Sequence, residues 1–344
     1  MQVQQVISQR LDVTLGRKRT DSGNYVDIIT GPNGCGKTEL LEVLLQYAKT
    51  PYQSRPNQRN LWPVVHASGT PDKVVVQTFS PFSRFEAPKA DITSLTARYT
   101  EDDIEQDKYV CAGLHRSSRS VGASLSRKVL EEALIRLSEN PESAEILFPV
   151  LYELGFQTRF SLGYKLKMGF KNAFEKNDPA RFIESHLLGM QSQGKLRPSD
   201  ARILRELNSS RGSEFLVVLR HSIDAVRDHH DLRAKSYILP ISLENVRRDF
   251  HVIQAFALLR RLDLLNLTSC ELQTSEAESI DVAKTSSGQQ QMLCAIFGLA
   301  TSISPGCLAL LDEPELSLHP EWQLKYVDAL FRIAQSVQDA HIVV

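Results

Sequence analysis

The stretch Gly31-Pro32-Asn33-Gly34-Cys35-Gly36-Lys37-Thr38 decides the fold class of this chain. It fits the pattern G-x-x-x-x-G-K-[ST], in which glycines let the backbone wrap around phosphate oxygens with its N–H groups pointing inward. A short apolar run, Tyr25 to Thr30, precedes the stretch. The stretch is followed by a helical pattern whose apolar face carries Leu41, Leu44, Leu45 and Ala48. Strand, glycine-rich loop and helix in this order predict a phosphate-binding loop (P-loop) in an α/β protein.

The residue types of this loop indicate the ligand. We expect Lys37 to reach the β- and γ-phosphates of ATP and the hydroxyl of Thr38 to bind Mg²⁺. The helix that starts here adds partial positive charge to the phosphate site. ATP and Mg²⁺ are therefore the expected cofactors. The phosphate contacts are expected from Gly31, Asn33, Gly34, Cys35, Gly36, Lys37 and Thr38.

A second stretch, Cys307 to Glu313, is an apolar run that ends in two carboxylates. Parallel strands are buried between layers of helices and therefore read as continuous apolar runs, with active sites at their carboxyl ends. We predict that Asp312 holds Mg²⁺ and that Glu313 is the general base that activates the attacking water. Glu313 and Lys37 are thus the expected catalytic residues.

The stretch Ser286-Ser287-Gly288-Gln289-Gln290-Gln291 resembles the signature of ABC-type ATPases, in the form common in RecF, SMC and OLD-like proteins. The stretch from Asp312 to Pro320 also resembles the Walker B to D-loop segment of that class. The resemblance implies an α/β P-loop NTPase of ABC-ATPase type that dimerises head-to-tail around ATP. It implies that one subunit closes the other's P-loop with Ser286, Ser287, Gly288 and Gln289. From the residues alone, the same serine could be a plain helix N-cap.

The resemblance suggests further site residues. Gln77 follows the strand Val74 to Val76, where the family's Q-loop glutamine would contact Mg²⁺; it could equally be an ordinary polar strand residue. Arg116 and Arg119 are candidates for interface or DNA contacts, with a solvated surface as the alternative. We interpret His229 and His230 as part of a surface helix, because a metal site would need a third ligand.

The order of patterns predicts an α/β core interrupted by an inserted lobe. We expect residues 1–115 to form the N-terminal part of the core, 116–266 a mainly helical lobe, and 267–344 the C-terminal part of the core. The family places a switch histidine after the strand that follows Walker B. The sequence ends on that strand, so we expect the chain to be truncated before this histidine and to hydrolyse ATP weakly; His341 is not given that role.

Composition excludes several classes of protein. Forty basic against 41 acidic residues give a net charge of −1, which offers no global argument for nucleic-acid binding. No apolar stretch approaches the roughly 20 residues of a membrane span, and the N-terminus has no signal-peptide pattern, so we expect a cytoplasmic protein. The five cysteines have neither zinc-ligand nor disulfide spacing and are interpreted as reduced thiols.

Three roles compete for this ATPase. The favoured one is an anti-phage defence ATPase, of Septu-like, retron-associated or OLD-like kind, that controls a partner effector such as a nuclease. The alternative is a DNA-repair or chromosome-maintenance ATPase of RecF/SMC type acting directly on DNA. A transporter motor is disfavoured by the pattern from Glu315 to Pro320. The expected partners are a second copy of the chain and an effector protein, with DNA as a further candidate.

Overall fold

The computed structural model describes residues 1–49, 63–80, 84–85, 108–113, 123–170, 172–233, 235–316 and 318–344. The described residues divide into two compact units. The first unit contains those up to Val129 and those from Ser286 to Val344, and the second contains Leu130 to Thr285. Among the residues that the structure describes, no helix has the length and apolar character needed to cross a bilayer.

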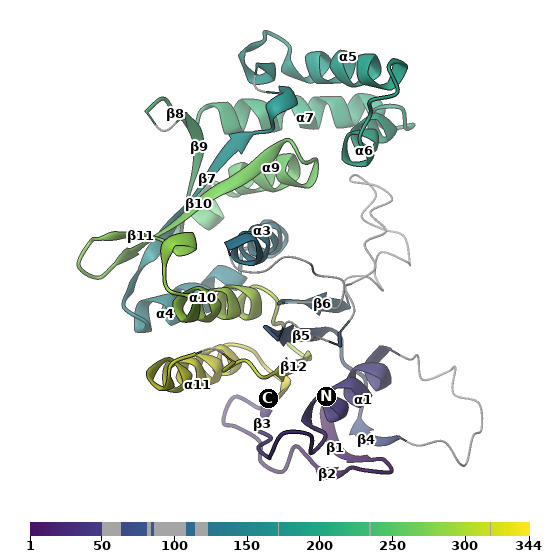
Figure 1. Ribbon diagram of the computed structural model, residues 1–344, viewed down its shortest axis with the longest axis vertical. Coiled ribbons are helices and arrows are strands. Elements are labelled where there is room, and N and C mark those ends of the chain that lie inside the picture. Colours follow the sequence, from purple (N-terminus) through teal and green to yellow (C-terminus); the bar gives the residue numbers. More distant parts are fainter. Residues whose placement is uncertain are drawn as a thin grey trace. The chain divides into compact units, whose positions relative to one another are not determined.

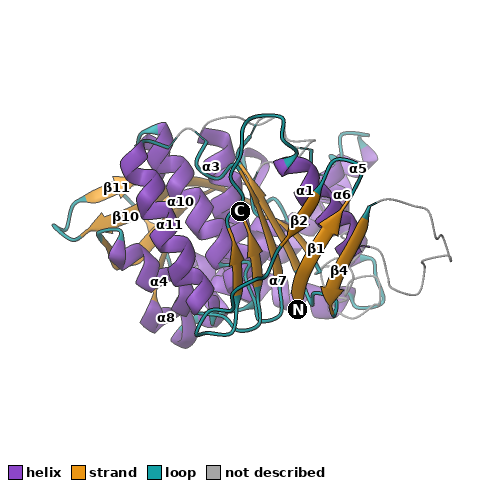
Figure 2. Cartoon of the chain, turned by 90° about the horizontal axis from the view of Figure 1, so that it is seen from below, coloured by secondary structure: helices purple, strands orange, loops and turns teal. Residues whose placement is uncertain are grey.

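A five-stranded parallel sheet forms the centre of the first unit (Figures 1 and 2). Its strands, in spatial order, are β3 (Tyr25–Asp27), β13 (His341–Val343), β12 (Leu308–Asp312), β5 (Val74–Thr78) and β6 (Tyr109–Cys111). Every residue of β5 and β12 is buried, as expected for parallel strands covered on both faces. A single strand, β13, separates the strand before the P-loop from the strand that ends in Asp312.

Helices cover this sheet. The helix α1 (Lys37–Lys49) packs against β12, and its side chains Leu40 and Leu44 belong to the buried core. The helix α10 (Ser287–Ala300) packs against β5 and against α11 (Pro320–Gln335), which runs beside it (Figure 2). The expected helix after the P-loop and the expected strand before Asp312 are therefore present.

A smaller antiparallel sheet lies beside the N-terminus of α1. Its order is β2 (Asp12–Thr14), β1 (Gln2–Ile7) and β4 (Val64–Ser68). The buried ring of His341 joins it to the parallel sheet: the Val3 N–H donates to His341 Nδ1 at 3.0 Å. Since Nδ1 accepts, the proton is on Nε2, which donates to Asp27 Oδ2 at 2.7 Å. His341 thus joins two sheets at the amino end of β13, the end opposite the P-loop.

The second unit contains a five-stranded sheet that the expectation of a mainly helical lobe did not include, although helices still make up most of its regular structure. This antiparallel sheet has the order β11 (Ser279–Asp281), β10 (Leu265–Thr274), β7 (Phe156–Leu166), β9 (Ser236–Ser242) and β8 (His230–Asp231). The long strand β10 pairs with β7 along most of its length. The segment 267–285, expected in the core, therefore belongs to the second unit, and the core resumes at Ser286.

Helices complete the second unit. Their bounds are α3 (Ala123–Glu139, which begins in the first unit), α4 (Ser143–Glu153), α5 (Pro179–Ser192), α6 (Pro198–Leu207), α7 (Gly212–Arg227), α8 (Leu243–Arg248) and α9 (Phe250–Arg261). The helix α9 packs on β10, α7 packs on α9, and α5 and α6 pack on α7 (Figure 1). Short 3₁₀ turns are η2 (Met168–Phe170), η3 (Ala173–Glu175) and η4 (Val282–Lys284).

Candidate nucleotide site

The glycine-rich loop connects β3 to the first residue of α1. Gly36 has a φ of +104°, a conformation that favours glycine, and a Cβ placed there would approach Leu11 Cδ2 to 2.8 Å. Gly34 also has a positive φ, +82°. The Lys37 ammonium donates to the Gly31 carbonyl at 2.8 Å, so the lysine side chain folds back over the loop. The backbone N–H groups at the start of α1 are those that can bind an anion.

Thr38 and Asp312 meet although 274 positions separate them. The Thr38 hydroxyl donates to Asp312 Oδ1 at 3.0 Å. A hydroxyl and a carboxylate oxygen are hard ligands of the kind that Mg²⁺ prefers, so this pair fits the ion that the sequence predicted. Asp312 ends β12 and is 6% exposed. Burial raises the pKa of Asp312, the hydrogen bond from Thr38 opposes that rise, and the charge of Glu313 adds to it.

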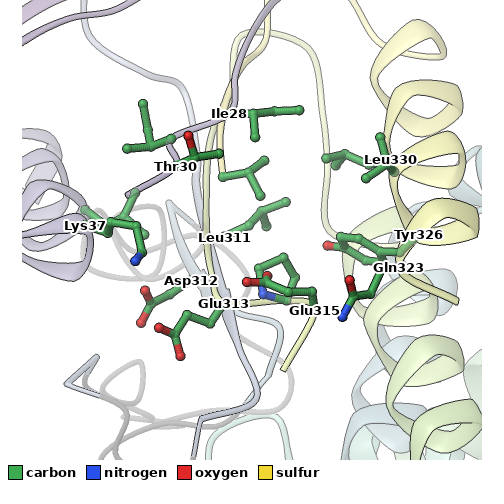
Figure 3. Close-up of a pocket in the computed structure, with 15 residues that line it drawn as sticks. Ile28, Thr30, Lys37, Leu311, Asp312, Glu313, Glu315, Gln323, Tyr326 and Leu330 are labelled. Carbon is green, nitrogen blue, oxygen red and sulfur yellow. The ribbon is translucent and has the colours of Figure 1, made fainter. Parts of the chain in front are cut away.

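Glu313 follows in a conformation that L-residues rarely adopt. Its φ is +47°, in the left-handed region, at the point where the chain leaves β12. Non-glycine residues in this region store backbone strain of about 1–3 kcal/mol and cluster at functional sites. Figure 3 shows the carboxylates of Asp312 and Glu313 next to one another, with the Lys37 ammonium near Asp312. The two carboxylates and the lysine thus lie together at the carboxyl end of the parallel sheet.

A cavity of about 260 Å³ opens beside these three side chains (Figure 3). Lys37, Asp312, Glu313 and Glu315 supply its charged lining. Apolar side chains from the ends of β3 and β12 and from α11 form the rest, among them Ile28, Leu311, Tyr326, Val327 and Leu330. The charged residues are therefore partly screened from water, which strengthens electrostatic interactions with a bound phosphate.

Ser286 caps the helix α10 at an exposed position. Its hydroxyl accepts from the Gln289 N–H at 3.4 Å, and the Gln289 side chain accepts from the Ser286 N–H at 3.3 Å, a capping box. Ser287 is exposed and Gly288 half-buried. None of the residues 286–289 lines the cavity beside Lys37. Within one chain, the structure does not place this segment in that cavity.

The remaining glutamines of the same run have partners that the sequence did not predict. Gln290 Oε1 accepts from the Ser126 hydroxyl of α3 at 3.3 Å. Gln291 Nε2 donates to the Pro314 carbonyl at 3.2 Å and also to the Leu316 carbonyl. Gln291 therefore ties α10 to the loop that directly follows Glu313. The only signal in the sequence was the run of three glutamines itself.

Gln77 makes hydrogen bonds to α10 and α11, and its contact with Mg²⁺ stays a prediction. The side chain is fully buried. Its amide donates to the Ala295 carbonyl of α10 at 2.9 Å and accepts from the Tyr326 hydroxyl of α11 at 3.2 Å. Its Nε2 also lies 3.4 Å from the Ala112 carbonyl. Gln77 thus satisfies buried polar groups between β5 and two helices, which favours its interpretation as a strand residue.

The remaining candidates are two arginines, two residues of the loop itself and two histidines. Arg116 and Arg119 fall outside the described residues. Asn33 and Cys35 are exposed in the loop. His229 Nδ1 contacts the Ala225 carbonyl at 3.0 Å, and in the described part of the chain no group of three His, Cys, Asp or Glu residues is arranged to hold a metal ion.

The chain matches a known family over most of its length. The family model described as "AAA domain, putative AbiEii toxin, Type IV TA system" matches residues 28–344. This range runs from the residue after β3 through the P-loop, both units and the end of the parallel sheet. No curated protein matches the chain.

Proposed function

The chain belongs to this family of AAA-domain P-loop ATPases, and on that premise we propose that it binds ATP with Mg²⁺ and hydrolyses it at the carboxyl end of its parallel sheet. The observation that carries the proposal is the hydrogen bond of Thr38 to Asp312 beside Lys37 and Glu313. This arrangement joins a phosphate-binding loop to a pair of carboxylates.

Each residue of the site has a definite task in this proposal. The loop N–H groups and Lys37 bind the phosphates, and the Lys37 ammonium leaves the Gly31 carbonyl to do so. Thr38 and Asp312 hold Mg²⁺, which neutralises charge on the phosphate oxygens when bound. Glu313 accepts the proton of the attacking water at its carboxylate.

The exposed N-terminus of α10 supports a dimer of the ABC type. Ser286, Ser287 and Gly288 lie outside their own chain's cavity, at a helix N-terminus whose dipole favours an anion. We propose that this segment closes over the γ-phosphate held by the P-loop of a second copy, so that two ATP molecules are held between two chains.

We further propose that the ATPase controls a partner effector, such as a nuclease, in defence against phage. The family description names a putative toxin of a type IV TA system. The alternative is an ATPase that acts on DNA directly, as in repair or chromosome maintenance. Co-expression with the neighbouring genes followed by phage challenge separates the two. If the chain alone protected cells, the proposal of a partner would fail.

Two substitutions test the ATPase proposal. We expect Lys37→Ala to weaken binding of a fluorescent ATP analogue by about 1.5–3 kcal/mol, because the variant cannot make the charge-assisted hydrogen bond to phosphate. Glu313→Gln keeps the shape of the side chain but cannot accept a proton, so binding should persist while phosphate release slows about 10²–10⁴-fold.

The controls are exposed residues with the same change of charge. Lys18→Ala and Glu321→Gln should leave affinity and rate unchanged, since neither residue lines the cavity. Wild-type affinity in Lys37→Ala, or wild-type turnover in Glu313→Gln, would overturn the assignment.

A further inference from the structure

The second unit contains a large pocket that has no role in the proposed ATPase. Its volume is about 1060 Å³, and it is lined by the end of β7, the segment that includes η3, the end of α7 and the β8–β9 hairpin. Pockets that bind small molecules typically measure about 300–1,000 Å³, so there is room for one or more nucleotides. All of its lining residues belong to the second unit.

Positive charge dominates this pocket. Lys165, Lys176, Arg227 and Lys235 line it, and Glu175 is the one carboxylate among its described lining residues. In the part of the chain that the structure describes, no carboxylate lies within ion-pair distance of Lys165 or Lys235. The excess of cations is therefore available to an anionic ligand.

Arg227 is one of these cations. Its Nη1 lies 3.3 Å from Asp224 Oδ1, and its Nη2 donates to the Lys176 carbonyl at 3.4 Å. Its Nε is buried and has no hydrogen-bond partner among the described residues. Because the Nε atom has almost no exposed surface, it does not itself face the pocket, but the Arg227 side chain is 40% exposed and remains one of the cations that line it.

Aromatic rings share the same pocket with these cations. The rings of Phe174 and Tyr237 pack with centroids 5.5 Å apart and planes at 63°. The ring of His230 lies 4.9 Å from that of Tyr237. Phe174 is 2% exposed, whereas Tyr237 is half-buried, so the tyrosine offers part of its ring to a ligand.

We propose that this pocket binds a phosphorylated nucleoside, either as a free nucleotide or within single-stranded nucleic acid. Cations around an aromatic ring suit a ligand that joins phosphate to a flat base: the lysines bind phosphate while the base stacks on the tyrosine. An acidic peptide would use the lysines and leave the ring unused. The pocket is therefore a second nucleotide-recognition site, separate from the P-loop.

The test uses the full chain with its P-loop silenced. In a Lys37→Ala protein without Mg²⁺, fluorescence anisotropy follows binding of a short fluorescein-labelled oligo(dT) strand. Competition by unlabelled AMP, by unlabelled oligo(dT) and by poly-glutamate identifies the preferred source of the ligand. A lower competitor concentration for the strand than for AMP assigns the pocket to single-stranded nucleic acid, and the reverse assigns it to a free nucleotide.

Charge and ring are then removed separately. We expect Lys165→Ala combined with Lys235→Ala to weaken binding at least tenfold. The slope of log Kd against log salt concentration should also fall by ~1.4, since each phosphate that the variant no longer neutralises accounts for about 0.7. Tyr237→Leu should weaken binding several-fold without changing that slope. Tyr237→Phe keeps an aromatic ring and should therefore bind with the affinity of the wild type. Thermal unfolding checks that each variant is folded.

The matched control is Lys195→Ala combined with Arg205→Ala. It makes the same change in net charge at exposed positions of the second unit that do not line the pocket. Equal loss of affinity in the control and pocket variants would overturn the proposal, because the effect would then be one of net charge. The proposal would also be overturned if poly-glutamate competed as strongly as nucleotide and Tyr237→Leu had no effect. The ligand would then be an acidic peptide.

Discussion

At the scale of single residues, two residues of the proposed site, Asp312 and Glu313, are in conditions that destabilise the folded protein. Asp312 is almost fully buried and lies beside Glu313, and both conditions disfavour its ionised form. Glu313 itself has an unfavourable backbone conformation. A site of this kind lowers the stability of the free protein and gains from a bound cation, since Mg²⁺ compensates the charge of two neighbouring carboxylates.

Replacing Asp312 should therefore stabilise the free protein. The pKa of Asp312 is raised in the folded state above its ordinary value of 3.8, so the folded protein binds the proton more tightly than the unfolded chain does. Its ionisation accordingly costs stability as the pH rises through and above 3.8. Asp312→Asn removes this cost, and its amide oxygen can still accept from Thr38.

We expect the melting temperature of Asp312→Asn at neutral pH to exceed that of the wild type, by about 2–4 °C for each kcal/mol of relief. The difference should shrink as the pH is lowered toward 3.8, where the wild-type carboxyl is protonated too. The variant should also lose the Mg²⁺ dependence of nucleotide binding. A lower melting temperature, or unchanged Mg²⁺ dependence, would contradict this account.

At the scale of elements, Gln291 connects the helix α10 to the loop that follows Glu313. Gln291 donates from α10 to the carbonyls of Pro314 and Leu316, directly after Glu313. The N-terminus of the same helix is the segment proposed to contact a second copy. A movement of α10 on dimerisation would therefore be transmitted to the loop that follows the general base.

Gln291→Ala should separate turnover from binding. We expect it to lower kcat about tenfold or more, because small displacements of a catalytic group are costly, while nucleotide affinity changes little. Removal of its hydrogen bonds should cost about 0.5–1.5 kcal/mol of stability for each bond. Gln335→Ala, at an exposed position of α11, is the matched control. Lower stability with unchanged kcat would leave Gln291 with a purely structural role.

The elements themselves were predicted unevenly. The helix after the P-loop was expected from its apolar face of Leu41, Leu44, Leu45 and Ala48, and the structure has it as α1. The strand β7 was missed, although its buried residues Phe160 and Leu162 flank the more exposed Ser161. Its sheet is antiparallel and its residues are of mixed burial, so its pattern is weaker than the continuous apolar run of β12. The expectation of a mainly helical lobe therefore left out the sheet to which β7 belongs.

At the scale of the whole molecule, the proposed site is complete only with two copies. We expect Glu313→Gln to form a dimer in MgATP, because ATP that is not hydrolysed holds the interface closed. Light scattering after size-exclusion chromatography should report twice the monomer mass with ATP and the monomer mass with ADP.

The proposed interface of this dimer contains the segment Ser286 to Gly288, and a substitution there should prevent dimerisation. Ser287→Arg introduces a bulky cation at an exposed position and leaves the capping box of Ser286 and Gln289 intact, so the helix should persist. In the Glu313→Gln protein it should abolish the ATP-dependent dimer. Ser192→Arg, at an exposed serine of α5, is the control. A dimer that survives Ser287→Arg would place the interface elsewhere.

The sequence by itself determined the P-loop and the carboxylate pair. Both are continuous stretches whose chemistry depends on local backbone: Gly31 to Thr38 carries its own glycines and lysine, and Leu308 to Glu313 carries its own strand and acids. Such features are readable because the interacting atoms are neighbours along the chain. The fold class followed from the same two stretches.

Only the tertiary structure decided which distant residues meet. The structure pairs Thr38 with Asp312, and it hydrogen-bonds Gln77 to α10 and α11. The net charge of −1 did not indicate the pocket of the second unit, because a sum of charges over the chain does not say where the charges lie. Lys165 and Lys235 are 70 positions apart and become neighbours only because β7 pairs with β9. Sequence reports charge and periodicity, whereas strand pairing and packing decide where side chains converge.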